Sequence, residues 1–263
     1  MSLPALLLQD LARLLAQVAG VSLADGLHRK LADGADAAAR AAGEPPRAFA
    51  RRVLARDPDA IAALVEQVVV GETAFWRHPE QLAAVTRLVA DAPGPLGVWS
   101  AGCATGEEPW SVAIALLEAG REGKGDRILA TDVSSRALAA AAEGVYGVRA
   151  LRKLPPALAA RWLEGGAQRR VRSELRSLVE LRRHNLVADP APPGPFDVVL
   201  CRNVLIHFEP RAAGAVLRRL AGALRPGGLL VLGPVELPLA ASVELEWVDE
   251  AGATLLRRPR RAG

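Results

Sequence analysis

The segment from Val98 to Ser111 constrains the fold of this 263-residue chain more than any other part of the sequence. It reads VWSAGCATGEEPWS, so a short apolar run leads into a glycine-rich turn and then into a helical pattern. Glycine at positions 102 and 106 lets the backbone approach a ligand closely at the carboxyl end of a strand. A strand, a glycine turn and a helix in this order predict the first unit of an α/β sheet with a ligand crevice at its edge.

The charges in this loop favour a cationic ligand over a phosphate. Glu107 and Glu108 stand at the start of the following helix, where their carboxylates repel a phosphate group. The amino and sulfonium groups of S-adenosylmethionine carry the opposite charge, and the loop lacks the Lys-Ser/Thr pair of a P-loop. The alternative is a tight turn with two exposed glutamates, one of them interacting with the helix dipole.

Polar residues follow two of the later strands. Asp132 ends the apolar run that begins at Arg127, where a carboxylate can bind the two hydroxyls of an adenosine ribose. It can instead cap the next helix, because it precedes two serines. Arg202 and Asn203 follow the apolar strand 196–201 and are expected to face the same crevice. They are not followed by the Asn/Asp-Pro-Pro-aromatic run typical of base-amine methyltransferases.

The spacing of apolar residues divides the chain into a helical part and an α/β part. Residues 1 to about 70 show only helical periodicity, with breaks at glycines that include Gly34. After a further helix that begins at Pro79, strands and helices alternate, which predicts a parallel sheet with helices on both faces. We expect a helical domain at 1–75, a connecting helix and linker at 76–95, and an α/β domain at 96–263.

Two segments depart from this alternation. The runs 243–248 and 254–257 follow each other without a helix, which predicts an antiparallel hairpin at an edge of the sheet. The segment from about 147 to 183 contains a Gly165-Gly166 turn and polar alternating stretches, among them Leu175 to Arg182. We expect this segment to form a small antiparallel β-subdomain inserted in the α/β domain.

The connecting segment GETAFWRHPEQL, residues 71–82, places Thr73 and Arg77 among aromatic side chains. An arginine in this setting can stack on a ring or clamp a carboxylate with two parallel hydrogen bonds. The alternative is a hinge whose aromatic side chains pack between the two domains.

Composition excludes several classes of protein. Apolar residues make up 51% of the chain, and the formal net charge is +4. Only three of the 33 basic residues are lysines, so we favour an arginine-rich composition over nucleic-acid binding. Cys103 and Cys201 are too few for a disulfide framework, and no zinc-site spacing is present. No apolar run approaches the length of a membrane span, so we predict a cytoplasmic protein without metal or membrane insertion.

Five segments together resemble the CheR-type chemotaxis receptor methyltransferases, which methylate glutamate side chains of chemoreceptors. The segments are GETAFWRHPEQL, VWSAGCATGEEPWSVAIAL, ILATDVSSRALAAAAEGVY, FDVVLCRNVLIHF and LRPGGLLVLGPVE. The resemblance implies a class I, Rossmann-like seven-stranded sheet, a small all-helical N-terminal domain and an inserted antiparallel β-subdomain. It implies S-adenosyl-L-methionine as the cofactor and S-adenosyl-L-homocysteine as the product.

The resemblance also implies the residues of the site. The cofactor contacts are expected at Thr73, Arg77, Gly102, Glu107, Asp132, Asn185, Leu186, Arg202 and Asn203. Arg77, with His207 nearby, is expected to be catalytic by orienting the substrate carboxylate against the methyl group. No general base is required, because a glutamate is already ionised at neutral pH.

Some positions depart from the family pattern. Gly71 replaces a frequent asparagine, His207 replaces the usual tyrosine, and only Glu236 remains of an H-S-E motif. The Gly165-Gly166 turn is shorter than in members that bind a tethering pentapeptide of the receptor, so we predict methylation without this tether. Two alternatives remain: a methyltransferase for another protein or a small carboxylate, and a non-catalytic S-adenosylmethionine sensor or adaptor.

The expected partner is the acidic cytoplasmic helical region of a chemoreceptor, bound by a monomer. A basic face on the N-terminal helices is electrostatically suited to this partner, although a solvated face in an arginine-rich protein is the alternative. The basic residues concerned are Arg29, Lys30, Arg40, Arg47, Arg51, Arg52 and Arg56.

Overall fold

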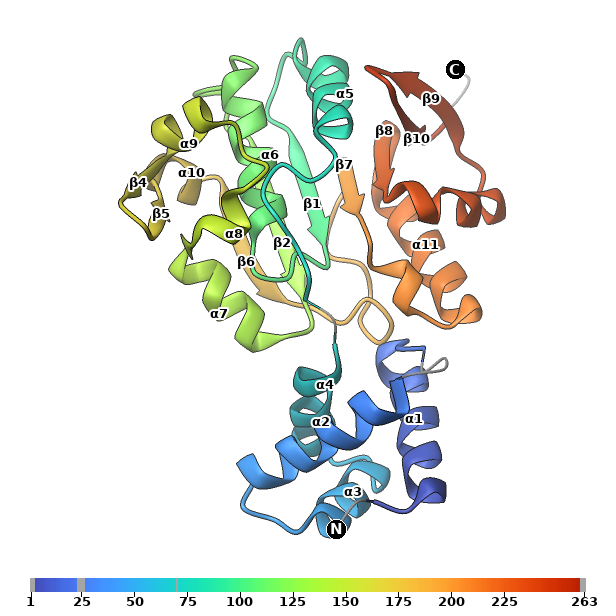
Figure 1. Cartoon of the computed structure of the whole chain (residues 1–263). Helices are drawn as coiled ribbons and strands as arrows, with labels where there is room; N and C mark the ends of the chain where they lie inside the picture. Colours follow the sequence, from blue (N-terminus) through green and yellow to red (C-terminus); the bar gives the residue numbers. More distant parts are fainter. Residues whose placement is uncertain (1–2, 23–26, 70, 261–263) are drawn as a thin grey trace.

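The first four helices pack around a core of their own (Figure 1). The computed structural model describes residues 3–22, 27–69 and 71–260. Asp57 caps one of these helices by accepting a hydrogen bond from the Ala60 N–H, and Pro58 occupies the first helical position. The four helices are α1 Ala5–Ala19, α2 Leu27–Ala41, α3 Pro46–Leu54 and α4 Pro58–Val68.

The prediction of a helix break at Gly34 was wrong, because Gly34 lies within α2. A Cβ atom at this position would lie 3.0 Å from Val68 Cγ1 and 3.2 Å from Gln67 Cβ. The absent side chain therefore allows α2 and α4 to approach closely. This packing outweighs the helix propensity of glycine, which is about 1 kcal/mol less favourable than that of alanine.

The remaining chain builds a seven-stranded sheet in the order β6-β2-β1-β7-β8-β10-β9. Strands β6, β2, β1, β7 and β8 are parallel, and β10 lies antiparallel between β8 and β9. This order confirms the predicted α/β sheet and its antiparallel edge hairpin. The strands are β1 Gly97–Ala101, β2 Arg127–Asp132, β6 Val179–Arg183, β7 Phe196–Cys201, β8 Leu224–Leu232, β9 Glu246–Glu250 and β10 Ala253–Arg257.

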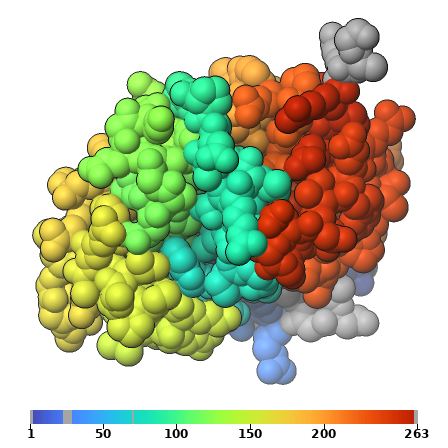
Figure 2. All heavy atoms as spheres, turned by 90° about the horizontal axis from the view of Figure 1, so that it is seen from above, coloured from blue at the N-terminus to red at the C-terminus, as the bar shows by residue number. Residues whose placement is uncertain are grey.

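Helices cover both faces of this sheet, as the alternation of buried side chains requires. Val98 and Val198 belong to the same core as α5 and α6, whereas Trp99 and Val199 belong to the core beneath α11. Seen from above, α5 lies between the β-subdomain and the C-terminal strands (Figure 2). The covering elements are α5 Pro79–Val89, α6 Glu107–Glu118, α7 Ser135–Glu143, α11 Pro210–Ala223, and the 3₁₀ helices η1 Leu205–His207 and η2 Pro234–Ser242.

A second, three-stranded antiparallel sheet is present, in the order β3-β5-β4, with β4 and β5 in the predicted insert and β3 just before it. Its strands and short helices are β3 Val145–Tyr146, α8 Val148–Leu151, α9 Pro156–Trp162, β4 Leu163–Gly165, β5 Arg169–Val171 and α10 Ser173–Arg176. The assignment of Leu175 to Arg182 to this small sheet was wrong, because β6 pairs in parallel with β2 instead. As an edge strand β6 is largely exposed, so its polar pattern resembles that of a small-sheet strand.

Two further features concern the helices and the cysteines. Across residues 3–22, 27–69 and 71–260, every helix falls short of the length and apolar character that a bilayer span requires. Cys103 and Cys201 are free thiols, and burial raises the pKa of each.

Candidate cofactor and methyl-transfer site

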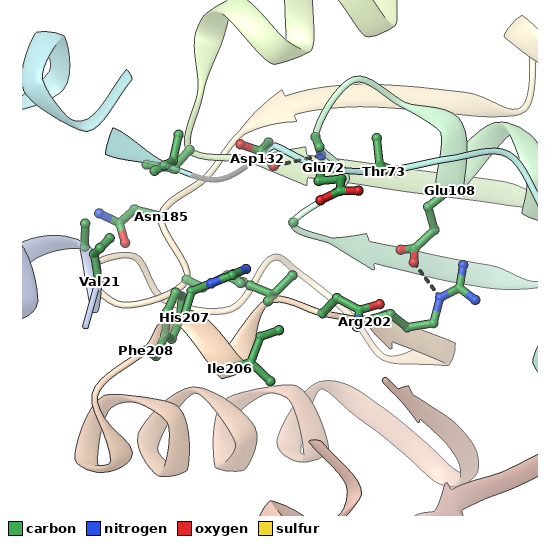
Figure 3. Close-up of a pocket in the computed structure, with 18 of the residues that line it drawn as sticks. Val21, Glu72, Thr73, Glu108, Asp132, Asn185, Arg202, Ile206, His207 and Phe208 are labelled. Carbon is green, nitrogen blue, oxygen red and sulfur yellow. Dashed lines mark hydrogen bonds and ion pairs between the residues drawn. The ribbon is translucent and has the colours of Figure 1, made fainter. Parts of the chain in front are cut away.

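A cavity of about 330 Å³ lies at the carboxyl ends of the parallel strands, beside residues 3–22 and 27–69, which we call the helical cluster (Figure 3). Its volume is within the range of small-molecule sites, about 300–1,000 Å³. Asp132 and Glu72 lie across the cavity from His207 and Phe208. The walls therefore combine carboxylates on one side with an imidazole and an aromatic ring on the other.

The structure brings nine of the ten predicted site residues to this one cavity. These are Thr73, Arg77, Gly102, Asp132, Asn185, Leu186, Arg202, Asn203 and His207. The tenth, Glu107, lines a neighbouring cleft of about 520 Å³ that shares Glu72, Thr73 and Ala74 with the cavity.

The glycine loop turns tightly, and both of its glutamates are buried. Gly102 and Gly106 have φ values of 83° and 95°. A Cβ atom on Gly106 would lie 2.8–2.9 Å from atoms of three neighbouring side chains, so packing also requires glycine there. Glu107 and Glu108 are 5% and 8% exposed, which excludes the alternative of two exposed glutamates. Burial raises the pKa of Glu107, although a hydrogen bond from the Thr105 hydroxyl opposes this shift.

Asp132 is held at the cavity wall by two backbone groups. Its Oδ2 accepts the Ala104 N–H at 2.8 Å, and its Oδ1 accepts the Ser134 N–H at 2.9 Å. Ser134 caps α7 through its own hydroxyl, which accepts the Ala137 N–H at 3.0 Å. The cap of α7 is therefore Ser134, and the Asp132 carboxylate remains at the cavity. Burial raises the pKa of Asp132.

Arg202 is engaged by the protein itself. Its Nε donates to Glu108 Oε2 at 2.6 Å, and its Nη1 donates to the Arg77 carbonyl at 2.6 Å. The Ser100 hydroxyl donates to the other oxygen of Glu108 at 2.6 Å, which completes a buried network. Arg202 thus fixes the backbone of Arg77 against the end of the sheet.

Arg77 and His207 lie near the helical cluster. The Arg77 side chain donates to the Glu72 carbonyl at 3.2 Å. The pKa of His207 is lowered, mainly by burial, and further by the charges of Lys30 and Arg77, whereas Glu236 opposes the shift. The imidazole is therefore neutral at pH 7. Both aromatic residues of the connecting segment belong to the α/β core: Phe75 packs edge-on against Tyr146, and Trp76 is partly buried against the same core. Neither is a contact between domains.

The helical cluster forms part of the cavity wall. It contributes Ala19, Val21, Ser22, Val68 and Val69. The Ser22 N–H donates to the His207 carbonyl at 2.7 Å, and the Asn185 amide donates to the Val18 carbonyl at 2.8 Å. Because Asn185 Oδ1 also accepts two backbone N–H groups, the side chain of this residue is occupied within the protein.

Sequence reasoning missed several residues of the site. Glu236 holds the loop after β7, and the retained glutamate of the altered motif was its only signal. Glu108 was recognised for its charge, but its buried partner Arg202 is 94 residues away and has no local signal. The small and apolar residues of the helical cluster that line the cavity had no sequence signal. The periodicity of apolar residues does not indicate which end of a helix contacts another domain.

The donors and acceptors of the cavity fit an adenosine carrying a cationic tail. Asn203 Oδ1 is buried without a hydrogen-bond partner in the described part of the chain, which leaves an acceptor for a ligand donor. Asp132 supplies a carboxylate for two hydroxyls, and Glu72 supplies negative charge, whereas the charge of Glu108 is paired with Arg202. No cluster of three His, Cys, Asp or Glu side chains suited to a metal occurs among the described residues.

Comparisons with known proteins agree with this chemistry. A family model described as "CheR methyltransferase, SAM binding domain" matches residues 71–245. Chemotaxis protein methyltransferase 2 of Pseudomonas aeruginosa is 37% identical over 193 residues, covering 70% of this chain and 69% of that protein. The chemotaxis protein methyltransferase of Klebsiella aerogenes is 36% identical over 181 residues, covering 66% of this chain and 62% of that protein.

One further relative is much longer than this chain, and solved structures also align with part of it. An uncharacterized 104.1 kDa protein of Rhodobacter capsulatus is 36% identical over 195 residues, and the chain spans 20% of its length. Among solved structures, the N-methyltransferase NodS of Bradyrhizobium japonicum with S-adenosyl-L-homocysteine aligns with a TM-score of 0.42 and 15% identity, over 69% of this chain and 87% of that one.

Proposed function

The chain belongs to the CheR methyltransferase family, and we propose that it transfers the methyl group of S-adenosylmethionine to glutamate side chains of a chemoreceptor-like protein. The observation that carries this proposal is the convergence of nine predicted residues on one cavity at the carboxyl ends of the strands. The relatives named chemotaxis protein methyltransferases support a receptor as the substrate. The products are glutamate methyl esters and S-adenosylhomocysteine.

The residues around the cavity suit this cofactor. The Asp132 carboxylate would accept the ribose hydroxyls, and Asn203 Oδ1 would accept a donor of the ligand. Glu72 places negative charge toward the amino and sulfonium groups, whereas Glu108 is paired with Arg202. Apolar side chains would pack against the adenine ring: Val21, Val133, Leu186 and Phe208.

The residues of the chain contribute positioning and not proton transfer. When bound, S-adenosylmethionine supplies an activated methyl group on a sulfonium. A glutamate carboxylate is ionised at neutral pH, so no side chain has to act as a base. The Arg77 guanidinium would orient this carboxylate through charge-assisted hydrogen bonds, while Arg202 holds the Arg77 backbone. Neutral His207 would donate a hydrogen bond without adding charge.

A labelled methyl-transfer assay tests this function. The protein is first titrated with S-adenosylmethionine and then incubated with a cytoplasmic fragment of a receptor. We expect label on the fragment that is released by base, as a methyl ester requires. Cofactor binding without transfer supports a non-catalytic sensor or adaptor, and transfer only to another protein or a small carboxylate supports the other alternative.

We propose that the receptor helix docks on the basic face of α2 and α3. Arg29, Arg40, Arg47 and Arg51 are exposed. Two other basic residues of this face are already bound: Arg52 pairs with Glu44 and Asp57, and Lys30 donates to the Val69 carbonyl at 3.4 Å. The four exposed arginines are therefore the residues of this face that suit an acidic helix.

The organisation of the molecule is also part of the proposal. We propose domain boundaries near residues 75 and 95, a monomeric enzyme, and docking that does not need a receptor pentapeptide. The two buried free thiols support a reducing, cytoplasmic compartment.

A further inference from the structure

A buried carboxylate without a cationic partner lies directly behind the cavity wall. Glu236, in η2, has no exposed surface, and none of the ion pairs among the described residues includes it. Its two oxygens accept hydrogen bonds from five backbone N–H groups. The donors are Asn203 (2.7 Å), Val204 (2.8 Å), Leu205 (2.7 Å), Ile206 (3.3 Å) and Gly233 (2.8 Å).

Four of these donors are consecutive and belong to the turn after β7. Successive backbone N–H groups that converge on one point form an anion-binding concavity, and here a side chain of the same chain occupies it. Burial of a charge without an opposite charge is unfavourable unless its hydrogen bonds are satisfied. The turn and the carboxylate therefore stabilise each other's geometry.

This turn carries two of the groups that face the cavity. Asn203 adopts a left-handed conformation, with φ of 60°, and its buried Oδ1 has no partner among the described residues. His207 follows the last of the four donors and also lines the cavity. Glu236 itself is not part of the lining, so any effect it has on a ligand passes through the turn.

The residue before η2 supports this geometry. A Cβ atom at Gly233 would lie 2.7 Å from Glu236 Oε2 and 3.1 Å from the Asn203 nitrogen. A side chain at position 233 would therefore displace either the carboxylate or the turn. The absence of a side chain at Gly233 thus leaves room for the contact between Glu236 and Asn203.

We propose that Glu236 is a positioning residue for methyl transfer, which holds Asn203 and His207 at the cavity by fixing the backbone of residues 203–206. The kinetic part of this proposal rests on the proposed function. Its structural part does not, because cofactor affinity and the state of His207 can be measured without a receptor.

The test compares Glu236→Gln with two matched controls. The glutamine has the size of the glutamate, but its amide directs a donor toward N–H groups that need an acceptor. Leu220→Ala removes a fully buried side chain of α11 and lowers stability without removing any hydrogen bond to the turn. Glu246→Gln removes one exposed negative charge on β9.

Four quantities are measured on each variant: the Kd for S-adenosylmethionine by calorimetry, kcat and KM on a receptor fragment, and the pKa of His207 by NMR, assigned with His207→Gln. For Glu236→Gln we expect a Kd at least tenfold weaker, a lower kcat, and a His207 pKa below the wild-type value, because a nearby negative charge is lost. The two controls are expected to keep the wild-type Kd and His207 pKa at temperatures where they are folded.

A folded Glu236→Gln protein with wild-type Kd and wild-type His207 pKa overturns the proposal, as does a Leu220→Ala protein that reproduces all three changes. If Glu236→Gln does not fold, Glu236→Asp decides. Aspartate keeps the negative charge, but its shorter side chain moves the carboxylate away from the N–H groups of the turn. For Glu236→Asp we therefore expect a weaker Kd for S-adenosylmethionine and a His207 pKa near the wild-type value. An unchanged Kd in this variant refutes the proposal. If the wild type binds the cofactor without methylating the receptor fragment, the proposed function fails, whereas the Kd and NMR comparisons still judge Glu236.

Discussion

Arg77 and Arg202 carry the same charge but lie in different surroundings. The Arg202 side chain is 1% exposed and directs its donors to Glu108, Gln81 and the Arg77 carbonyl. The Arg77 side chain lines the cavity, and its only hydrogen bond among the described residues is to the Glu72 carbonyl. Of the two arginines, Arg77 therefore has donors left for a substrate carboxylate.

Replacement of Arg77 by alanine is expected to lower kcat/KM for the receptor fragment by about 10-fold to 100-fold. A hydrogen bond to a charged group contributes about 1.5–3 kcal/mol, which corresponds to this range. Arg87→Ala, which removes an exposed arginine of α5, serves as the control. Wild-type methyl transfer together with wild-type cofactor affinity in Arg77→Ala would exclude the assigned role.

Asp132→Asn is expected to weaken S-adenosylmethionine binding at least tenfold, because an amide offers one acceptor oxygen where the carboxylate offers two. Since burial raises the pKa of Asp132, wild-type affinity is expected to fall with decreasing pH already above the ordinary carboxyl range. The affinity is highest where Asp132 is ionised and is lost as pH falls through its raised pKa. Calorimetry across pH 4 to 7 checks this, and an equally steep pH dependence in Asp132→Asn would contradict it.

At the scale of elements, the glycine loop shows how a backbone conformation and a packing requirement combine. Gly106 and Gly120 both have positive φ, at 95° and 77°. A Cβ atom at Gly106 would meet Ala141, Trp110 and Tyr146, whereas at Gly120 there is no atom within 4 Å. Alanine at Gly120 therefore measures the backbone strain at positive φ alone, whereas alanine at Gly106 adds the steric contacts of the Cβ atom.

Gly106→Ala is expected to destabilise the protein by about 1–3 kcal/mol more than Gly120→Ala, because overpacking adds to backbone strain. It should also weaken cofactor binding, since the loop carries Gly102 and Ala104 at the cavity. Urea unfolding and calorimetry of both variants measure these effects. Equal losses of stability in the two variants would show that crowding at Gly106 is relieved without cost.

Local patterns predicted the parts of the fold that depend on local chemistry. The glycine turn and the polar residues that end β2 and β7 were recognised, because each is a departure from an apolar run at a defined place. The strand β6 was assigned to the wrong sheet, because an exposed edge strand has the same polar alternation as a strand of a small sheet. The sequence around Gly34 wrongly predicts a helix end, because the contact of Gly34 with α4 joins positions 34 residues apart and has no local signal.

At the scale of the whole molecule, the distribution of arginine gives the docking proposal a measurable consequence. The double variant Arg47→Glu/Arg51→Glu is expected to raise KM for an acidic receptor fragment several-fold at low salt and to weaken its dependence on ionic strength. Arg218→Glu, on α11, applies a charge reversal to a different surface. If KM and its salt dependence are unchanged in the double variant, the basic face is solvated and does not bind the receptor.

The short Gly165-Gly166 turn leads to a second prediction at this scale. Receptor fragments with and without a C-terminal pentapeptide are expected to be methylated with KM values that agree within about twofold, because no tether raises the effective concentration of the substrate. Steady-state kinetics on the paired fragments measures this ratio. A KM at least tenfold lower for the fragment with the pentapeptide would contradict the prediction.

Contacts across the boundary between the two parts of the chain could not be predicted from local sequence. The Ser22 N–H meets the His207 carbonyl, and Glu66 binds the N-terminal end of α7 through Ser134 and Ser135. These pairs are separated by about 70 to 185 positions along the chain. These contacts depend on how the helical cluster packs against the α/β part. The periodicity of apolar residues within one helix does not encode that packing.

The shared wall of the cavity links occupancy to stability. Val21 and Val69 come from the helical cluster, whereas Asp132 and Phe208 come from the α/β part, so a ligand in the cavity contacts both. A ligand at 100 times its Kd stabilises the state that binds it by about 2.7 kcal/mol. The same free energy opposes separation of the two parts, so a bound ligand is expected to hold the helical cluster on the α/β part.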